Sequence, residues 1–272
     1  MRFDDVQISD LLIHPISNHY IYSTMRKLFA LTFFVLHFTL SFGQHYNKAY
    51  GNPIVVLTIT NPWLMVIGSD TPYFTIYQNG QIIYKKIIKG RSKFYEVKLT
   101  KKQVQSVIKS LNITADIFKL PKEIKTVYAT DQPTNELILN FDSVKVVNVY
   151  GYLQNEKGEE RLKTPKSFLT IYDNILKYKN DSAKAWLPDS VEVMLTSYSY
   201  APEKSLKWPS NWPDLTSKST IKRGDDLYSI YLDKRYLNDL VKLISSMKEK
   251  QAIQITGQKF SISYRFPFPN IQ

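Results

Sequence analysis

The chain of 272 residues contains no cysteine, and its four histidines, His14, His19, His37 and His45, all lie within the first 45 residues. Without cysteine there is no disulfide, no thiolate metal site, no Cys nucleophile and no lipid-modified Cys. Beyond His45 the chain also lacks imidazole. Ser-His-Asp hydrolysis, His-assisted phosphoryl transfer and His/Cys zinc sites are therefore excluded from that part of the sequence.

Glycine is scarce as well, with nine residues, and neither a GxxxxGK[ST] nor a GxGxxG motif occurs. A loop that cradles phosphate needs such glycines, so we expect no nucleotide, no cofactor and no metal site of these kinds. The chemistry that remains is carboxylate chemistry, Lys or Tyr acid-base chemistry, binding of hard cations by oxygen ligands, or none.

The sequence is rich in apolar and basic residues, with 43% hydrophobic residues, 14% aromatic residues and a formal net charge of +12. This composition is typical of a globular protein rather than of a disordered chain. The excess of positive charge favours anionic partners, whose binding salt should weaken.

The segment 25–43 has the three-part layout of a secretory signal peptide. Met25-Arg26-Lys27 precedes fifteen mostly apolar residues (28–42), and small residues at Ser41 and Gly43 suit cleavage after Gly43. A membrane anchor is the alternative, but fifteen residues reach only about 22 Å as a helix, short of a hydrocarbon core of about 30 Å. We therefore expect an exported protein, periplasmic or extracellular, with no stable membrane span after cleavage.

Residues 1–24 carry Asp4, Asp5 and Asp10, where a signal peptide should have a basic leader. The simplest hypothesis is that translation begins at Met25 and that 1–24 is a leader that the cell does not make. A peptide from 1–24 in the mass spectrum of the precursor would contradict it. Residues 1–43 contain as many basic as acidic residues, so residues 44–272 keep the charge of +12.

Periodicity predicts an α+β fold with antiparallel sheets and about three packed helices. Asn79-Gly80 between strands 73–78 and 81–84 is a strong hairpin signal of the type I′ kind. Helix 101–111 begins with a capping box of Thr100 and Gln103, and further helices are expected at 166–178 and 234–247. The remaining expected strands are 54–60, 64–68, 95–99, 136–141, 144–150, 191–198, 227–232, 253–256 and 260–266.

The polar stretch 154–166 is the best candidate for a boundary, which gives two α+β halves, 44–155 and 165–272, or one continuous domain. The segment 94–100 with its helix aligns with 227–233 and its helix, and both continue into two strands. This pattern favours a duplicated strand-helix-strand-strand unit. The alternative is that any strand-to-helix junction needs an apolar strand, a cap and an amphipathic helix.

Two tryptophans mark the segment 201–224 as the first candidate binding site, in the string Trp208-Pro209-Ser210-Asn211-Trp212-Pro213-Asp214. Trp208 and Trp212, beside Asp214, could stack on sugar rings or on a partner, since the prolines would order the loop beforehand. The alternative is that both indoles anchor the loop on the core. Tyr198 and Tyr200, two residues apart on an expected strand, could form the floor of a binding groove. The alternative is that they pack in the core or on the surface.

The densest basic stretch is the second candidate site, with Tyr84, Phe94 and Tyr95 interleaved among cations. It could bind an anionic cell-surface polymer, whereas nucleic acid is not the expected partner of an exported protein. The alternative is that the lysines only guard an exposed strand edge. The residues expected to bind anions are Lys85, Lys86, Lys89, Arg91 and Lys93.

Adjacent carboxylates occur beyond residue 43 only at Glu159-Glu160 and Asp225-Asp226. Sequence neighbours do not by themselves give the 5 to 9 Å separation across a cleft that glycoside hydrolysis needs. The favoured function is therefore non-catalytic binding of a ligand or partner in the bacterial envelope: a glycan, an anionic polymer or an envelope protein. The alternatives are a carboxylate-dependent hydrolase acting on glycans and a purely structural envelope component.

The segment 74–84, followed by Leu99-Thr100 and its helix, resembles a loose group of uncharacterised exported proteins of Bacteroidetes-type bacteria that share a similar hairpin. The end of the apolar segment, Gly43-Gln44, is similar to their signal peptides. The resemblance covers about a quarter of the chain. It implies an envelope or secreted setting and no known activity.

Overall fold

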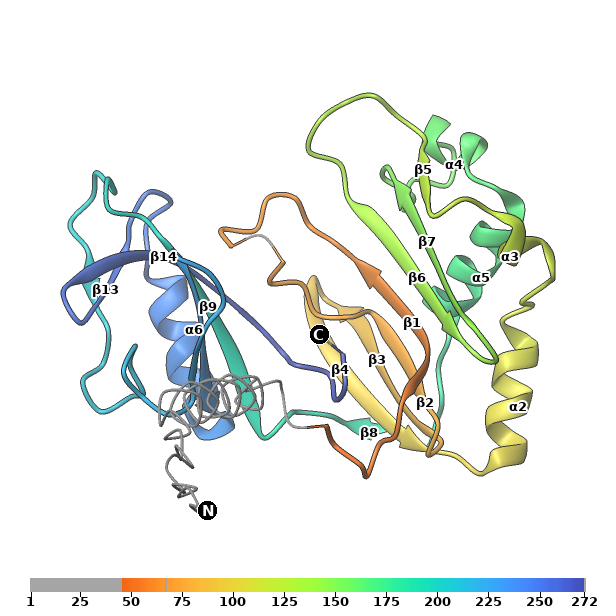
Figure 1. Ribbon diagram of the computed structural model, residues 1–272, viewed down its shortest axis with the longest axis horizontal. Helices are drawn as coiled ribbons and strands as arrows, with labels where there is room; N and C mark the ends of the chain where they lie inside the picture. Colours follow the sequence, from red (N-terminus) through yellow and green to blue (C-terminus); the bar gives the residue numbers. More distant parts are fainter. Residues whose placement is uncertain (1–45, 67, 272) are drawn as a thin grey trace, which may run out of the picture. The chain divides into compact units, whose positions relative to one another are not determined.

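The computed structural model describes residues 46–66 and 68–271 (Figure 1). The predicted leader 1–24 and signal peptide 25–43 lie outside the described residues. Residues 44–272 group as one compact unit. The described part of the chain contains five α-helices and fourteen strands, which confirms the α+β class, and none of these helices is long and apolar enough to cross a membrane.

Eight strands form the larger sheet, called sheet A. Its order is β5-β7-β6-β1-β2-β3-β4-β8, and every pair is antiparallel except β5 with β7. The strands are β1 (Pro53–Ile59), β2 (Phe74–Tyr77), β3 (Gln81–Ile88), β4 (Arg91–Lys98), β5 (Glu123–Lys125), β6 (Thr134–Asn140), β7 (Val144–Tyr150) and β8 (Lys184–Ala185).

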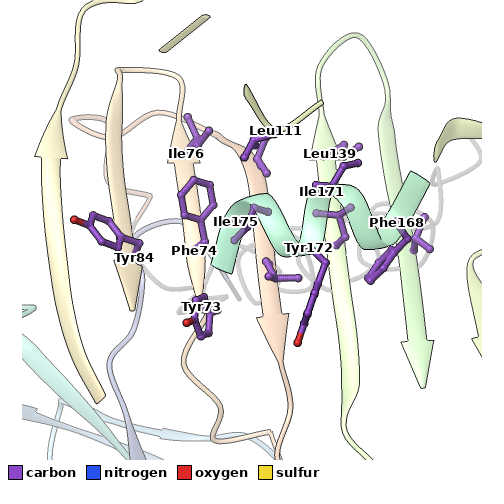
Figure 2. Close-up of a cluster of buried hydrophobic side chains, with 14 of the residues drawn as sticks. Tyr73, Phe74, Ile76, Tyr84, Leu111, Leu139, Phe168, Ile171, Tyr172 and Ile175 are labelled. Atoms are coloured by element: carbon purple, nitrogen blue, oxygen red, sulfur yellow. The ribbon is translucent and has the colours of Figure 1, made fainter. Parts of the chain in front are cut away.

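One face of sheet A carries the helices α2 (Lys101–Ser110) and α5 (Lys166–Lys177), with the short α3 (Asp116–Lys119) between them in sequence. The capping box of Thr100 and Gln103 is present at the start of α2, as predicted. Figure 2 shows α5 crossing the strands, with its predicted apolar face turned toward Phe74 and Leu139 of the sheet. The buried residues of that helix face are Phe168, Ile171, Tyr172 and Ile175.

The predicted hairpin of β2 and β3 is confirmed, but its turn is not of type I′. Gly80 has φ +88°, whereas Asn79 is outside the left-handed region. Gly80 is required there, because a Cβ would clash with the carbonyl oxygen of Leu99. Positive φ at two successive turn positions, the mark of a type I′ turn, occurs instead at Lys89 and Gly90, between β3 and β4.

The opposite face of sheet A is covered by aromatic residues from two segments, one directly after β8 and one near the end of the chain. Tyr77, Ile83 and Phe94 of the sheet pack against Trp186 and Phe268. Phe94 lies edge-on to both of these aromatic rings. Sequence periodicity gave no sign of this cluster, because Trp186 and Phe268 lie outside any periodic segment.

Six strands form the second sheet, called sheet B, in the order β10-β13-β14-β9-β12-β11. One face packs on α6 (Leu237–Ser245), which follows the single turn η1 (Lys234–Tyr236), and its core includes the apolar residues of the segment 201–224. The strands are β9 (Ser190–Ser197), β10 (Leu206–Lys207), β11 (Thr220–Lys222), β12 (Leu227–Asp233), β13 (Ile253–Ile255) and β14 (Gln258–Arg265).

The change from sheet A to sheet B falls after residue 186, later than the polar stretch 154–166 that the sequence favoured. α5 and β8, which the predicted second half 165–272 would contain, belong to sheet A. The polar stretch itself holds the short α4 (Glu159–Lys163), and Arg161 ties it to α5 through two hydrogen bonds to Asp173, at 3.1 and 2.6 Å. This ion pair connects the polar stretch to α5.

Two further expectations differ from the structure. Residues 64–66 and 68, expected in a strand, lie in the loop that joins β1 to β2. The strand-helix-strand-strand order is β12-α6-β13-β14 in the second unit, but in the first unit α3 and β5 come between α2 and the β6–β7 hairpin, and the hairpins join their sheets in opposite senses. β6, the first hairpin strand, pairs with β1, whereas β14, the second, pairs with β9. The two units are therefore not topological copies.

Candidate anion-binding surface at one end of sheet A

Three loops leave the same end of sheet A, called here the loop end. Loop 60–73 joins β1 to β2, the β3–β4 turn joins the next two strands, and loop 126–133 leads into β6 (Figure 1). The strand registers place them together, because Thr60 donates its backbone N–H to Thr134 and Lys85 donates its own to Tyr73. This end therefore gathers segments that are far apart in the sequence.

The β3–β4 hairpin distributes the five predicted anion-binding residues over both faces. Lys86 pairs across the strands with Lys93, and Ile88 with Arg91. These pairs lie on the face that carries the helices, since Tyr84, two residues before Lys86, belongs to the helix-facing core. Lys85 therefore points to the opposite face, and Lys89 occupies the turn.

Lys85 contributes to internal structure rather than to an open surface. Its Nζ lies 5.1 Å from the centroid of the Tyr73 ring, and it is half-buried. Burial lowers the pKa of Lys85, and the nearby Asp70 carboxylate opposes part of that effect. This lysine thus stabilises loop 60–73 against the sheet.

Lys86 has a structural partner as well. Its Nζ donates to the carbonyl oxygen of Leu176 at 3.3 Å, in the last turn of α5, where a cation is favoured by the helix dipole. Burial and the neighbouring Lys179 lower the pKa of Lys86. The ammonium group of Lys86 therefore contributes a hydrogen bond within the protein.

Lys89, Arg91 and Lys93 are exposed, and none of them has a carboxylate oxygen within 4 Å among residues 46–66 and 68–271. Glu96, the acidic residue of β4, is occupied by Lys184 at 3.1 Å. Like charges directly opposite on a sheet destabilise it, so the Lys86–Lys93 pair costs the fold free energy. An anion between the two would remove that cost.

The rung next to these cations is aromatic. Tyr84 and Tyr95 stack across β3 and β4 with their ring centroids 5.7 Å apart, and the Nζ of Lys86 lies 5.8 Å from the Tyr84 ring. The helix-facing side of the hairpin therefore runs from an aromatic pair through a pair of lysines to Ile88 and Arg91 at the tip.

The loop end also exposes large apolar side chains. Trp63 is 74% exposed and Ile87 is 57% exposed, on loop 60–73 and on the β3–β4 tip. Loop 60–73 is held firmly, since Asn61 donates its N–H to Asp70 Oδ1 at 2.8 Å and accepts from the N–H of Trp63 at 3.0 Å. The exposed apolar residues of this end are Trp63, Met65, Ile87, Ile88 and Tyr128.

Trp208 and Trp212 lie elsewhere, in the core of sheet B. Each is only 8% exposed, their rings meet edge-on at 5.0 Å, and Trp208 Nε1 donates to the carbonyl oxygen of Pro213. Asp214 closes a turn by accepting from Thr216, and this side-chain hydrogen bond holds its pKa below the usual value. The arrangement is that of an anchored loop, the alternative weighed from the sequence.

Tyr198 and Tyr200 do not share a strand face, because β9 ends at Ser197. Tyr198 is half-buried and its N–H donates to Lys259, whereas Tyr200 lies in the following turn and is 94% exposed. The structure therefore does not bring the five predicted binding residues of this region together on one surface.

The carboxylates are dispersed. Glu159 is paired with Lys163, and Asp225 with Lys222. Burial raises the pKa of Asp70 and of Glu136, but different charges surround each: Lys85 and Arg265 for Asp70, Lys122 and Glu123 for Glu136. In the described part of the chain no group of three or more His, Cys, Asp or Glu side chains could hold a metal ion.

A buried ionic network lies on the face of sheet B away from α6. Glu192 is fully buried and accepts from Ser229 Oγ at 2.7 Å, Arg265 Nε at 2.8 Å and Arg223 Nη2 at 3.0 Å. Burial alone would raise the pKa of Glu192, but the two guanidinium groups and the hydroxyl lower it. Glu192 is therefore held ionised and acts as a structural tie.

Comparison of the chain with family models, curated proteins and solved structures gives no match. The assignment of this surface is therefore argued from its residues alone. Sequence reasoning found its cations but missed Trp63, although Asn61-Pro62-Trp63 carries the same Pro-stiffened, Asn-flanked indole that drew attention to Trp208 and Trp212. That local composition was a usable signal at both places.

Proposed function

We propose that this protein is an exported, non-catalytic protein of the bacterial envelope that binds an anionic partner through the β3–β4 tip. The signal-peptide pattern of 25–43 supports export, and the net charge of +12 supports an anionic partner. The decisive observation is the set of three exposed cations, Lys89, Arg91 and Lys93, that lack carboxylate neighbours among the described residues.

The structure changes the order of the two candidate sites. The sequence favours the segment 201–224 as the contact, but its indoles pack in the core of sheet B. The hairpin tip keeps its charge in solvent, opposes Lys86 to Lys93 at a cost in stability, and presents Tyr95 one rung away. Such a surface suits a partner that supplies several negative charges.

The test is binding to heparin, used as a model polyanion, over a series of salt concentrations. In the tip variant Lys89→Glu, Arg91→Glu and Lys93→Glu are combined. The matched control is Lys101→Glu, Lys102→Glu and Lys109→Glu on α2, three exposed lysines that bring the same change in net charge. Counterion release predicts that the tip variant loses about three units of the slope of log K against log salt.

The control should lose much less, because α2 starts from the end of sheet A opposite to the loop end. Equal losses in both variants would mean that heparin senses only the net charge, and the assignment to the tip would then be wrong. The tip variant should fold normally, since it removes the repulsion between Lys86 and residue 93.

A further inference from the structure

We propose that the anionic partner is a lipid surface, and that the protein docks on it with the loop end of sheet A among the headgroups. This inference rests on the proposed function and names its partner. It is carried by exposed apolar side chains that stand beside the unpaired cations of the same end.

The β3–β4 tip is exposed on both faces of the hairpin. Successive strand residues point to opposite faces, yet Ile87 is 57% exposed and Ile88 is 39% exposed. Earlier in the same strand Ile82 and Ile83 are fully buried, Ile82 in the core beneath the helices and Ile83 in the cluster with Trp186 and Phe268. The tip therefore projects beyond both covering layers.

Loop 60–73 offers a second, rigid apolar projection. Val66 is buried and Ser69 donates to Ser263 at 2.8 Å, so the loop is fixed on its inner side. Its outer side presents Trp63 and Met65 to solvent. An indole held this way loses little conformational freedom on contact, which favours binding.

The combination of residue types decides among partners. Tryptophan and tyrosine prefer the interface between headgroups and hydrocarbon, aliphatic side chains enter it, and cations attract anionic headgroups. A polysaccharide would use aromatic faces and hydroxyl-binding groups but would leave Ile87, Ile88 and Met65 in water. The loop end carries all three of the elements that a membrane surface uses.

The spacing also fits one contact area. Loop 60–73 begins at β1, and the β3–β4 tip lies two to three strands away in the sheet. At about 4.8 Å between strands this is roughly 10 to 15 Å. Loop 126–133, with exposed Tyr128, continues the row on the other side, since β6 neighbours β1.

The test is co-sedimentation of residues 44–272 with vesicles of phosphatidylcholine alone and of phosphatidylcholine mixed with phosphatidylglycerol. This stretch forms a compact unit and contains the three core clusters of the described residues, so it is expected to fold without 1–43. It also lacks the apolar segment 28–42, which could itself enter the vesicles.

The apolar variant combines Trp63→Ala, Ile87→Ser and Ile88→Ser. Its matched control combines Phe141→Ala and Val144→Ser, two exposed apolar residues at the β6–β7 turn, at the opposite end of sheet A. We expect binding to the anionic vesicles, at least tenfold weaker binding by the apolar variant, and unchanged binding by the control. Each tip cation removed should weaken binding about fivefold.

The inference is overturned if the protein does not bind to anionic vesicles, or if the apolar variant and its matched control lose binding equally. If the protein does not bind to vesicles but its binding to heparin is weakened by the tip variant and not by the α2 control, the proposed function stands. The anionic partner is then a polymer and not a lipid surface. If heparin also fails to depend on the tip, the proposed function falls with the inference.

Discussion

Two loops of this protein have nearly the same local composition and opposite roles. Loop 60–73 and the segment 201–224 both contain Trp beside Pro, Asn and Asp, but Trp63 is exposed whereas Trp208 and Trp212 are buried. Local composition therefore predicts an ordered loop around tryptophan. It does not predict which way the indole faces.

The difference follows from what covers each sheet. The helix face of sheet A is filled by α2 and α5, and among the described residues of loop 60–73 Tyr73, the last one, joins that core. Among residues 46–66 and 68–271, α6 with its preceding turn is the one helical element that packs on that face of sheet B, and the segment 201–224 supplies further apolar volume with Trp208, Trp212, Leu206 and Leu215. In sheet B, which fewer helical residues cover, aromatic residues of a loop therefore complete the core.

The largest expected effect is at the buried indoles. Trp208→Ala should lower the free energy of unfolding by about 3 to 5 kcal/mol, because it empties a large space in the core of sheet B and removes the edge-on contact with Trp212. Urea denaturation followed by circular dichroism measures the change. A loss below about 1 kcal/mol would mean that the segment 201–224 does not complete that core.

Glu192→Gln should give the next largest loss in free energy of unfolding, because the two arginines bound to Glu192 connect both loops to sheet B. Arg223 belongs to the segment 201–224, and Arg265 donates to Gly68 of loop 60–73 at 3.0 Å. Removing the carboxylate charge leaves two guanidinium groups against each other, with an expected loss of about 3 kcal/mol at pH 7. The unfolding midpoint in urea reports it, with Glu159→Gln on the surface as control.

The same variant tests a pH dependence. The pKa of Glu192 is lowered in the folded protein, so its stabilising contribution is present above the unfolded value of about 4.3 and is lost as the pH falls through the folded value. The difference in free energy of unfolding between the wild-type protein and Glu192→Gln should therefore disappear in that acid range. An advantage that stays constant down to pH 2 would contradict the assignment.

Val66→Ala isolates the anchor of loop 60–73. Val66 is almost fully buried, and the loss of its two methyl groups should cost about 2 kcal/mol. Because Val66 lies in the same loop as Trp63, the substitution should also raise the mobility of Trp63, which time-resolved fluorescence anisotropy detects. Unchanged anisotropy would show that the loop is ordered by its hydrogen bonds alone.

Trp63→Ala should have the smallest effect on stability, within about 0.5 kcal/mol, since an exposed side chain contributes little to folding. Measured beside Trp208→Ala under the same conditions, it gives the sharpest contrast between the two loops. A loss of more than 2 kcal/mol would place Trp63 in a core and remove it from any contact surface.

Sequence reasoning succeeded where local signals decide structure. The capping box of Thr100, the apolar face of α5 and the Asn79-Gly80 hairpin all depend on residues close in sequence. It failed where distant segments meet on one surface, as when Trp186 and Phe268 cover sheet A. The cations of the β3–β4 tip were visible in sequence, but their division between faces required the strand register.

The most direct test of the contact surface uses the tryptophans themselves. Trp63 is the exposed one of the four, since Trp186, Trp208 and Trp212 are each 8% exposed. On addition of anionic vesicles to residues 44–272, the emission should shift to the blue and acrylamide quenching should fall, and neither change should occur in Trp63→Phe. Co-sedimentation with vesicles that leaves the emission and quenching of Trp63 unchanged would contradict docking through the loop end of sheet A.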